Sequence, residues 1–555
     1  MVENYTSWKS AGGNNADHIG GNGYEFSYVD EKTGERKTVQ VDYGSLFSNK
    51  EETGYDCFIP TMPNCDDILI THGHADHIGG IAHLMNIKRE EFAAKRERGE
   101  NLTIHCTPFA EQMIKNSLSG IPKEEWPAFN TVEPGKPFEV NGFKIEPFAI
   151  SHSIPDAVGF VIESPDGTRM MTTGDFKTAK VPVGKGWEDD KIAEVASKGI
   201  DYLFIDSTSA VQQGVTIGEA DVKDGLKGIL KNSQGGPVIS GVISSSCHRL
   251  HTVASALAEE ALEKAGKDGT PKPRTMILDG ASLIAARRAL NNCGYKLEEM
   301  IKQETGVDIK IMAANAKGVQ NIPPEERFYV CTGTQGEEAS MLKIAEGRNK
   351  NVSLEEMRET SGKGRKLPIY VYDLQSCIPG SEERHQALEE KFQKAGCTTY
   401  FPSRYKPNKY TVHASGHASA GDVAKICQVV SKNSPRSTTV VPIHGDPQQR
   451  RNVMKIAQDN GLNACIVPNM AEMKMPKGGR PIWQDGKKTE EWIGVNDANN
   501  DFRRPFFKYD KIQLNVATGE RTKTGYYRYK FAARKPRDDS NAVLAKVAMK
   551  KHGRM

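Results

Sequence analysis

The sequence lacks the cysteine patterns that hold zinc in small structural sites. Its 555 residues include ten cysteines, and none of them form a CxxC pair or another zinc-finger spacing. Isolated cysteines of this kind are typical of small buried residues in a reducing compartment. Any metal is therefore expected to be held by histidines and carboxylates.

Long apolar runs and a signal pattern are also absent. No run approaches the roughly 20 apolar residues that a membrane helix needs. Residues 1–13 show no basic stretch followed by an apolar one. We therefore expect a cytoplasmic protein, and its length predicts two or more domains.

The small net charge of +3 is unevenly distributed. From residue 501 onward, fifteen Lys and Arg face five Asp and Glu, so this end carries +10 and residues 1–500 carry −7. A basic end on an acidic body indicates a polyanion contact or a solvated tail. The run Tyr-Tyr-Arg-Tyr-Lys-Phe at 526–531 suits stacking on bases. A strand with one aromatic face packed on the body explains the run equally well.

Short β-branched runs alternate with helical patterns along the chain, which predicts an α/β fold. We find no internal repeat. The main predicted strands are 67–71, 143–150, 170–173, 202–205, 237–243, 275–278, 328–331, 367–372 and 438–443, and the main predicted helices are 82–96, 252–267 and 421–432.

Four candidate metal ligands occur within six residues, directly after the predicted strand 67–71. His72 and His74 are two apart in an extended segment, so their side chains point to one side. Asp76 and His77 follow at the start of a helical pattern. A solvated polar loop is the alternative, but it leaves this density of ligand types unexplained.

Further candidates follow other strand-like runs, where side chains can converge on a rigid edge. Each zinc takes about four ligands, so the motif alone is insufficient for two ions. His152, Asp175 and His444 each end such a run. We predict two Zn²⁺ per chain, one held by His72, His74 and His152 and the other by Asp76, His77 and His444, with Asp175 bridging them.

These residues resemble the motifs of the metallo-β-lactamase superfamily. Asp42-Tyr43-Gly44 is similar to its first motif, in which the Asp supports the metal loop without ligating. The second, third and fourth motifs correspond to 72–77, His152 and Asp175.

Three later stretches resemble the β-CASP branch, whose members act on nucleic acids. Asp206-Ser207-Thr208 is similar to its motif A, the run 413–419 to motif B and His444 to motif C. A His at motif C goes with RNA-acting members. Ordered matches over about residues 8–470 resemble the ribonuclease J family in particular, including Ile19-Gly20-Gly21-Asn22, Thr173-Gly174-Asp175-Phe176-Lys177 and Cys247-His248-Arg249.

The resemblance implies an αββα sandwich interrupted by an inserted α/β β-CASP domain. The implied boundaries are 1–210 and 408–495 for the two parts of the metallo-β-lactamase domain, 211–407 for the β-CASP domain and 496–555 for a short basic C-terminal tail. About 110 residues follow His444, where the family usually has a linker and a domain that supports dimers. A dimer of that kind is therefore not expected, and another homo-oligomer stays open.

The motifs also imply the catalytic groups. His417 is the candidate general acid, Asp206 would orient either His417 or a metal ligand, and Asp175 acts with them. A phosphate donor that transfers no proton is the alternative for His417. Small residues at 413–417 let backbone N–H groups approach a phosphate. The implied substrate-binding residues are His413, Ala414, Ser415, Gly416 and His417, with Ser245, Ser246 and His248.

Taken together, these features predict a zinc-dependent ribonuclease that degrades single-stranded RNA from an accessible 5′ end. The enzyme is expected to prefer 5′-monophosphate ends, whereas activity with Mn²⁺ or Mg²⁺ and internal cuts stay open. A single-stranded DNA nuclease and a non-catalytic RNA-binding subunit are the alternative functions.

Overall fold

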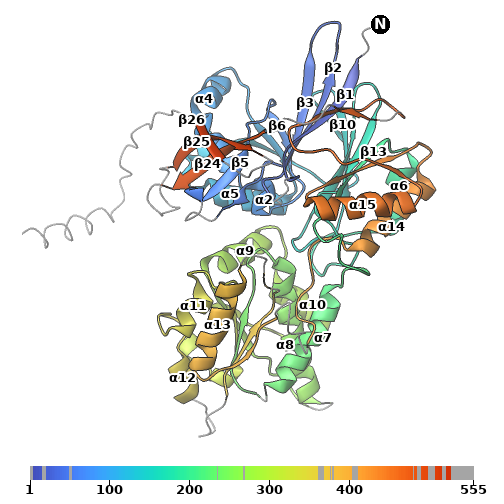
Figure 1. Ribbon diagram of the computed structural model, residues 1–555. Helices are drawn as coiled ribbons and strands as arrows, with labels where there is room; N and C mark the ends of the chain where they lie inside the picture. Colours follow the sequence, from blue (N-terminus) through green and yellow to red (C-terminus); the bar gives the residue numbers. More distant parts are fainter. Residues whose placement is uncertain are drawn as a thin grey trace, which may run out of the picture.

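The computed structural model consists of two units, drawn one above the other in Figure 1. It describes residues 4–14, 20–48, 53–233, 235–266, 269–359, 368–375, 377, 381–402, 410–478, 481–483, 489–497, 507–515 and 521–526. No helix among these residues has the length and apolar character needed to cross a membrane.

The upper unit is built around two β-sheets that contain residues from both ends of the chain. The first has the order β23-β22-β1-β2-β3-β6-β7-β8, and the second has the order β21-β20-β13-β12-β11-β10-β9. The bounds in the first are Ile482–Trp483, Glu472–Lys474, Tyr5–Gly12, Gly23–Val29, Arg36–Val41, Asp67–Leu69, Thr103–Cys106 and Ala128–Thr131. Those in the second are Asn463–Ala464, Thr439–Ile443, Tyr202–Asp206, Arg169–Thr172, Val158–Glu163, Phe143–Ala149 and Phe138–Val140.

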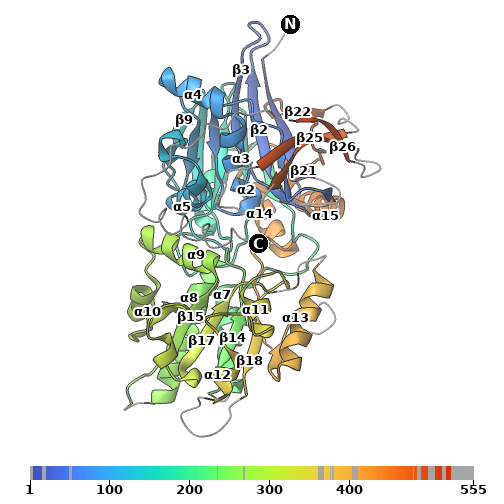
Figure 2. The same ribbon diagram turned by 90° about the vertical axis from the view of Figure 1, so that its left-hand side faces the viewer.

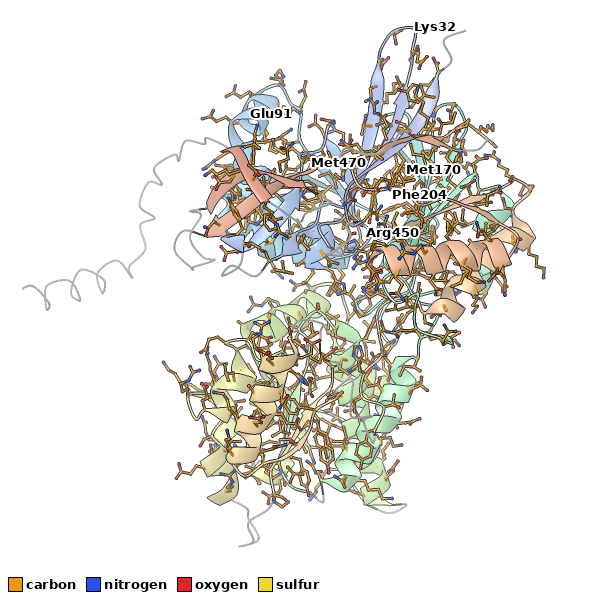
Figure 3. The ribbon with its side chains drawn as sticks, viewed as in Figure 1. Lys32, Glu91, Met170, Phe204, Arg450 and Met470 are labelled. Carbon is orange, nitrogen blue, oxygen red and sulfur yellow. The ribbon has the colours of Figure 1, made fainter. Side chains whose placement is uncertain are left out.

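Apolar side chains from both sheets form one core between them. Trp8 and Phe26 of the first sheet contact Phe204 of the second, with ring centroids 4.9 and 5.2 Å apart. Met170 is buried in the same core, and Figure 3 shows it with Phe204 inside the upper unit.

Helices cover the outer faces of both sheets. The first sheet packs on α2, α3 and α5, and the second on α6, α14 and α15. The predicted αββα sandwich is therefore confirmed. These helices are Ala75–Ile78, Ile81–Ile87, Pro108–Ser117, Asp189–Ser197, Ala420–Asn433 and Pro447–Asp459.

One predicted helix of the upper unit is wrong in its continuity. The pattern at 82–96 predicts a single helix, but α3 ends at Ile87 and α4 (Arg89–Glu97) begins after Lys88, whose φ of −96° and ψ of 20° leave the helical region. Leu84 and Phe92 nevertheless pack into the same core. The apolar pattern thus indicates that both helices are buried in one core, and it gives no sign of the break between them.

The lower unit is a parallel six-stranded sheet with helices on both faces. Its order is β16-β15-β17-β14-β18-β19. One face packs on α7 to α10 and the other on α11 to α13, an arrangement that Figure 2 shows from the side. Strands β14 to β19 are Val238–Gly241, Thr275–Asp279, Ile311–Ala313, Arg327–Cys331, Tyr370–Asp373 and Thr398–Tyr400. Helices α7 to α13 are Glu219–Asn232, Cys247–Ala265, Ala281–Asn292, Leu297–Thr305, Ser340–Ala345, Leu354–Glu359 and Glu382–Lys394.

The lower unit therefore interrupts the upper one, as an inserted domain would. The boundaries 211–407 stay a prediction, and residues 403–409, around the predicted return, lie outside the described residues.

Two strands of a smaller sheet lie within the predicted tail at 496–555. This sheet has the order β26-β25-β24-β5-β4. Tyr509 is buried, and its hydroxyl lies 3.2 Å from His83 Nδ1 on α3. Part of the predicted tail is thus folded against the helix that follows the metal motif, and the aromatic residues at 527–531 lie outside the described residues. The strands are Arg521–Tyr526, Phe507–Asn515, Thr489–Asp497, Cys57–Pro60 and Leu46–Phe47.

Candidate metal centre and phosphate loop

Three histidine rings meet at the edge of the upper unit that faces the inserted unit. His74 Nδ1 lies 3.0 Å from both His72 Nε2 and His152 Nε2. His72 and His74 follow strand β6, and His152 follows β10, so two sheets contribute to one cluster. The three residues predicted to share a metal are thus brought together.

The outer nitrogen of each ring faces a hydrogen-bond acceptor. His152 Nδ1 donates to the Gly416 carbonyl at 2.7 Å, and His74 Nε2 lies 3.5 Å from the Ser245 carbonyl. His72 Nδ1 lies 3.1 Å from the Thr71 hydroxyl, whose own proton goes to Asp42. The protons therefore reside on the outer nitrogens, and three lone pairs converge where a cation would be bound.

A second cluster joins Asp76, His77, Asp175 and His444, with one candidate ligand atom of each within 4.8 Å of the others. The Thr208 hydroxyl donates to the His444 carbonyl and can accept only from His444 Nδ1, at 2.8 Å. The lone pair on His444 Nε2 then faces Asp76 Oδ2 at 3.3 Å. Two acceptors that face each other require positive charge between them, either a cation or a proton on the ring.

Asp42 orients the second cluster from outside it. Its carboxylate accepts from His77 Nδ1 at 2.7 Å and from the Thr71 amide and hydroxyl, both at 2.8 Å. The φ of Asp42 is 58°, a backbone conformation that is rare outside glycine. The bond to Asp42 directs His77 Nε2 toward Asp175, as the first motif implies.

Asp175 lies between the two clusters. Its Oδ2 is 3.1 Å from His77 Nε2, 3.7 Å from His72 Nε2 and 3.9 Å from His152 Nε2. Its Oδ1 lies 3.0 Å from His444 Nδ1, and neither this Oδ1 nor His444 Nε2 makes a hydrogen bond of good geometry in the described part of the chain. Buried acceptors without a hydrogen bond, where seven candidate ligand residues meet, fit bound metal. That Asp175 would bridge two ions stays a prediction.

The pKa shifts follow the same charge pattern. Burial lowers the pKa of His72, His74 and His152, which keeps these rings in the neutral form that ligates. Burial also opposes charge on His77 and His444, but nearby carboxylates, Asp175 foremost, raise the pKa of both rings. The carboxylates of the second cluster therefore favour positive charge at this point.

His417 and Asp206 form a pair beside the second cluster. His417 Nδ1 lies 2.9 Å from Asp206 Oδ2 and 3.7 Å from Asp175 Oδ2. Burial lowers the pKa of His417, but the Asp206 and Asp175 carboxylates outweigh it, so the net direction is upward. The His417 side chain is 23% exposed, whereas that of Asp206 is 1% exposed. A protonated ring held by a buried carboxylate can give a proton to a leaving group.

The loop that precedes His417 has its carbonyl groups tied to other segments. Arg249 Nη1 donates to the Val412 carbonyl at 2.7 Å, and Lys177 Nζ donates to the Ser415 carbonyl at 2.9 Å. The Gly416 carbonyl is held by His152. No hydrogen bond within the described residues takes the N–H of Ser415 or Gly416. A loop whose carbonyl groups are already bonded and whose amide N–H groups are free to donate is suited to binding an anion.

The inserted unit brings a second set of predicted substrate-binding residues to the same edge. Ser245 contacts His74 through its carbonyl, and Ser246 is mostly buried at the start of α8. The His248 ring is only 1% exposed. The rings of His248 and His413 have unpartnered nitrogens within the described chain, and burial lowers the pKa of each ring to about 3. Contact of His248 with substrate stays a prediction.

Two asparagines near the N-terminus support the second cluster, and sequence reasoning gave neither a role. Asn14 Oδ1 accepts from the His444 amide at 3.0 Å, where the φ of His444 is 51°. Asn22 Nδ2 lies 3.2 Å from the Asp76 carbonyl and 3.1 Å from His77 Nε2. The motif at 19–22 is the only signal for Asn22. No local pattern connects Asn14 with a histidine 430 residues away.

Replacing Gly44 by alanine is expected to deform the second cluster. A Cβ there would lie 1.6 Å from the Asp76 carbonyl oxygen and 2.8 Å from the His77 amide nitrogen. Backbone atoms cannot rotate away, so we expect the metal content to fall by at least half and unfolding stability to fall by about 1–3 kcal/mol. Metal analysis and thermal denaturation check this. Gly120→Ala is the control, since nothing lies within 4 Å of its Cβ, and equal metal content in both variants would contradict the prediction.

The chain is similar to several known proteins. The sequence profile described as the beta-lactamase superfamily domain matches residues 58–230, which contain the motifs from His72 to Asp206. Ribonuclease J of Mycobacterium tuberculosis is 26% identical over 76% of this chain and 67% of its own length. Ribonuclease J 1 of Streptococcus pyogenes serotype M3 is 27% identical over 81% of this chain and 71% of its own. A solved structure from Enterococcus faecalis V583, a protein of unknown function, covers 86% of this chain and 100% of its own with 13% identity and a TM-score of 0.49.

Proposed function

From this homology to bacterial ribonucleases J, we propose that the chain is a metal-dependent ribonuclease that hydrolyses RNA phosphodiester bonds. The observation that carries the proposal is the placement of the His417–Asp206 pair beside two metal-ligand clusters that share Asp175. The finer parts of the proposal are two zinc ions, 5′-to-3′ degradation and a preference for 5′-monophosphate ends.

When bound, the metal ions would supply positive charge and an activated water at the scissile phosphate. The protein supplies the rest. Neutral rings of His72, His74 and His152 provide one set of ligands, and the carboxylates of Asp76 and Asp175 keep the second set negative. The amides of Ser415 and Gly416 receive a phosphate oxygen, and His417, held by Asp206, protonates the leaving 3′ oxygen.

A closed end to the substrate path would favour trimming from the 5′ terminus. The Ser245 carbonyl lies against His74, so the inserted unit contacts the metal centre itself. We propose that Ser245, Ser246 and the loop at 413–417 border one space from two sides. We propose that this space receives the terminal 5′-monophosphate and that a 5′-triphosphate, with two further phosphates, fits it less well.

Digestion of end-labelled RNA tests the function. We expect RNA with a 5′-monophosphate to be degraded at least tenfold faster than RNA with a 5′-triphosphate, with mononucleotides as the main product. His77→Ala should abolish both reactions, because it removes a ligand of the second cluster. His251→Gln is the matched control, since His251 pairs with Glu304 on the inserted unit.

The outcome of this digestion distinguishes the proposed function from the alternative functions. Internal fragments would show an endonuclease, and degradation of single-stranded DNA with RNA left intact would show a DNA nuclease. Equal slow cleavage of both RNAs that persists in His77→Ala would overturn the proposal. Less than one zinc per purified chain, with RNA bound and uncut, would favour a non-catalytic RNA-binding subunit.

The cellular location is part of the proposal. All ten cysteines are free, and seven of them are buried. Free buried thiols fit a reducing compartment, which supports the expected cytoplasmic location.

A further inference from the structure

The buried carboxylate of Asp422 joins three segments that surround the candidate active site. It lies on α14, directly after the motif at 413–419, and is fully buried. Its Oδ1 accepts from the amide and hydroxyl of Thr178, which follows the bridging Asp175 by three residues. Its Oδ2 accepts from the Thr216 amide at 2.8 Å and from the Ser419 amide at 3.1 Å.

Thr216 continues this network to His417. The Thr216 hydroxyl donates to the His417 carbonyl at 2.9 Å, while its amide is held by Asp422. The ring of His417 is held separately by Asp206 at 2.9 Å. The backbone of the candidate general acid and its imidazole therefore have different supports, one from Asp422 through Thr216 and one from Asp206.

Helix capping explains only part of this arrangement. Asp422 occupies the third position of α14 and forms a capping box with Ser419. A capping box satisfies amides at the start of its own helix, and it requires no bonds to Thr178 or Thr216. Those two residues lie more than 200 positions away in the sequence. Charged acceptors form the stronger hydrogen bonds, and a fully buried one is retained only where its partners are fixed.

We propose that Asp422 is a positioning residue, which holds His417 at the metal centre through Thr216. The proposal rests on the ribonuclease function proposed above, because it assigns His417 to the chemical step. A shift of about 1 Å in a catalytic group can cost on the order of 100-fold in rate. Asp422 affects kcat by holding His417 in position, and it does not contact the substrate.

Asp422→Asn is the principal test, because an asparagine of the same size has one acceptor oxygen for donors that now face two. We expect kcat for RNA to fall 10- to 100-fold while KM changes less than threefold and the zinc content is unchanged. The matched control is Asp221→Asn. Asp221 is the third residue of α7, a helix of the same 14-residue length, and its exposed carboxylate accepts from the Gly218 amide at the start of that helix at 2.9 Å.

Thr216 gives a second test that leaves the buried carboxylate intact. Thr216→Val removes the hydroxyl that holds the His417 carbonyl, and Thr216→Ser keeps it. We expect Thr216→Val to lower kcat at least fivefold and Thr216→Ser to retain at least half of it. Thr216 is only partly buried, so both variants are expected to fold.

A spectroscopic measurement separates this inference from the proposed function. In protein labelled with ¹³C-histidine, the His417 ring signal, assigned from its absence in His417→Gln, should shift in Asp422→Asn and Thr216→Val and stay in place in Asp221→Asn. An inactive wild type would refute the ribonuclease proposal but leave this shift testable. An unmoved His417 signal, or equal kcat losses in Asp422→Asn and Asp221→Asn, would overturn the positioning role.

Discussion

Asp175→Asn is expected to lower RNA hydrolysis by at least about 1,000-fold, or about 4 kcal/mol of transition-state stabilisation. Asp175 is the carboxylate between the two clusters, with Oδ2 3.1 Å from His77 Nε2 and Oδ1 3.0 Å from His444 Nδ1. An asparagine offers one acceptor, and its NH₂ group would point at the other cluster. If Asp175 bridges two ions, as proposed, its loss affects both of them, so the expected loss exceeds the 10- to 100-fold typical of groups behind a ligand.

The measurements are the rate of RNA cleavage and the zinc content of the purified variant. Asp201→Asn is the control, since Asp201 is a buried carboxylate outside the site that pairs with Arg436. We expect Asp201→Asn to reduce stability but to keep the zinc and the activity of the folded protein. An Asp175→Asn variant with unchanged zinc and more than a tenth of the wild-type rate would contradict the bridging role.

His417→Gln is expected to slow RNA cleavage by about 100- to 10,000-fold, the range for loss of a general acid. Glutamine can still donate a hydrogen bond to a phosphate but cannot transfer a proton. Bis(p-nitrophenyl) phosphate provides the comparison, because its nitrophenolate leaving group needs no protonation. With that substrate, His417→Gln should lose less than tenfold in rate.

The two substrates separate the two roles that the sequence leaves open for His417. A general acid gives a large loss for RNA and a small loss for the nitrophenyl ester. A phosphate donor without proton transfer gives equal losses for both. Equal losses would therefore reassign His417 to phosphate binding, and Asp206, 2.9 Å from its ring, would then act only to orient that donor.

Much of the fold follows from patterns within single segments. Strand-like runs at 143–150 and 202–205 correspond to β10 and β13, and the helical pattern at 421–432 lies within α14. The pattern fails where packing overrides it. The helix predicted at 82–96 breaks at Lys88, and part of the predicted tail forms β25 and β26 because Tyr509 and Ile512 are buried against the body.

In the candidate metal centre, too, some ligands follow from the local sequence and others depend on distant segments. His72, His74, Asp76 and His77 lie within six residues, so the alternation of an extended chain and the turn into a helix were enough to predict their convergence. His152, Asp175 and His444 come from three other segments. They were predicted from their positions at strand ends and from the motif resemblance. The structure brings all seven residues together in two clusters.

By itself, the sequence determined the chemical types at the metal centre and their local direction, because the spacing of neighbouring residues sets where their side chains point. Only the tertiary structure decided which nitrogen of each ring faces inward, because that depends on acceptors such as Asp42, Gly416 and Thr208 on other segments. The same holds for Asp422, which contacts Thr178 and Thr216 across more than 200 residues. Such contacts arise from the packing of sheets and helices, and no local period in the chain encodes them.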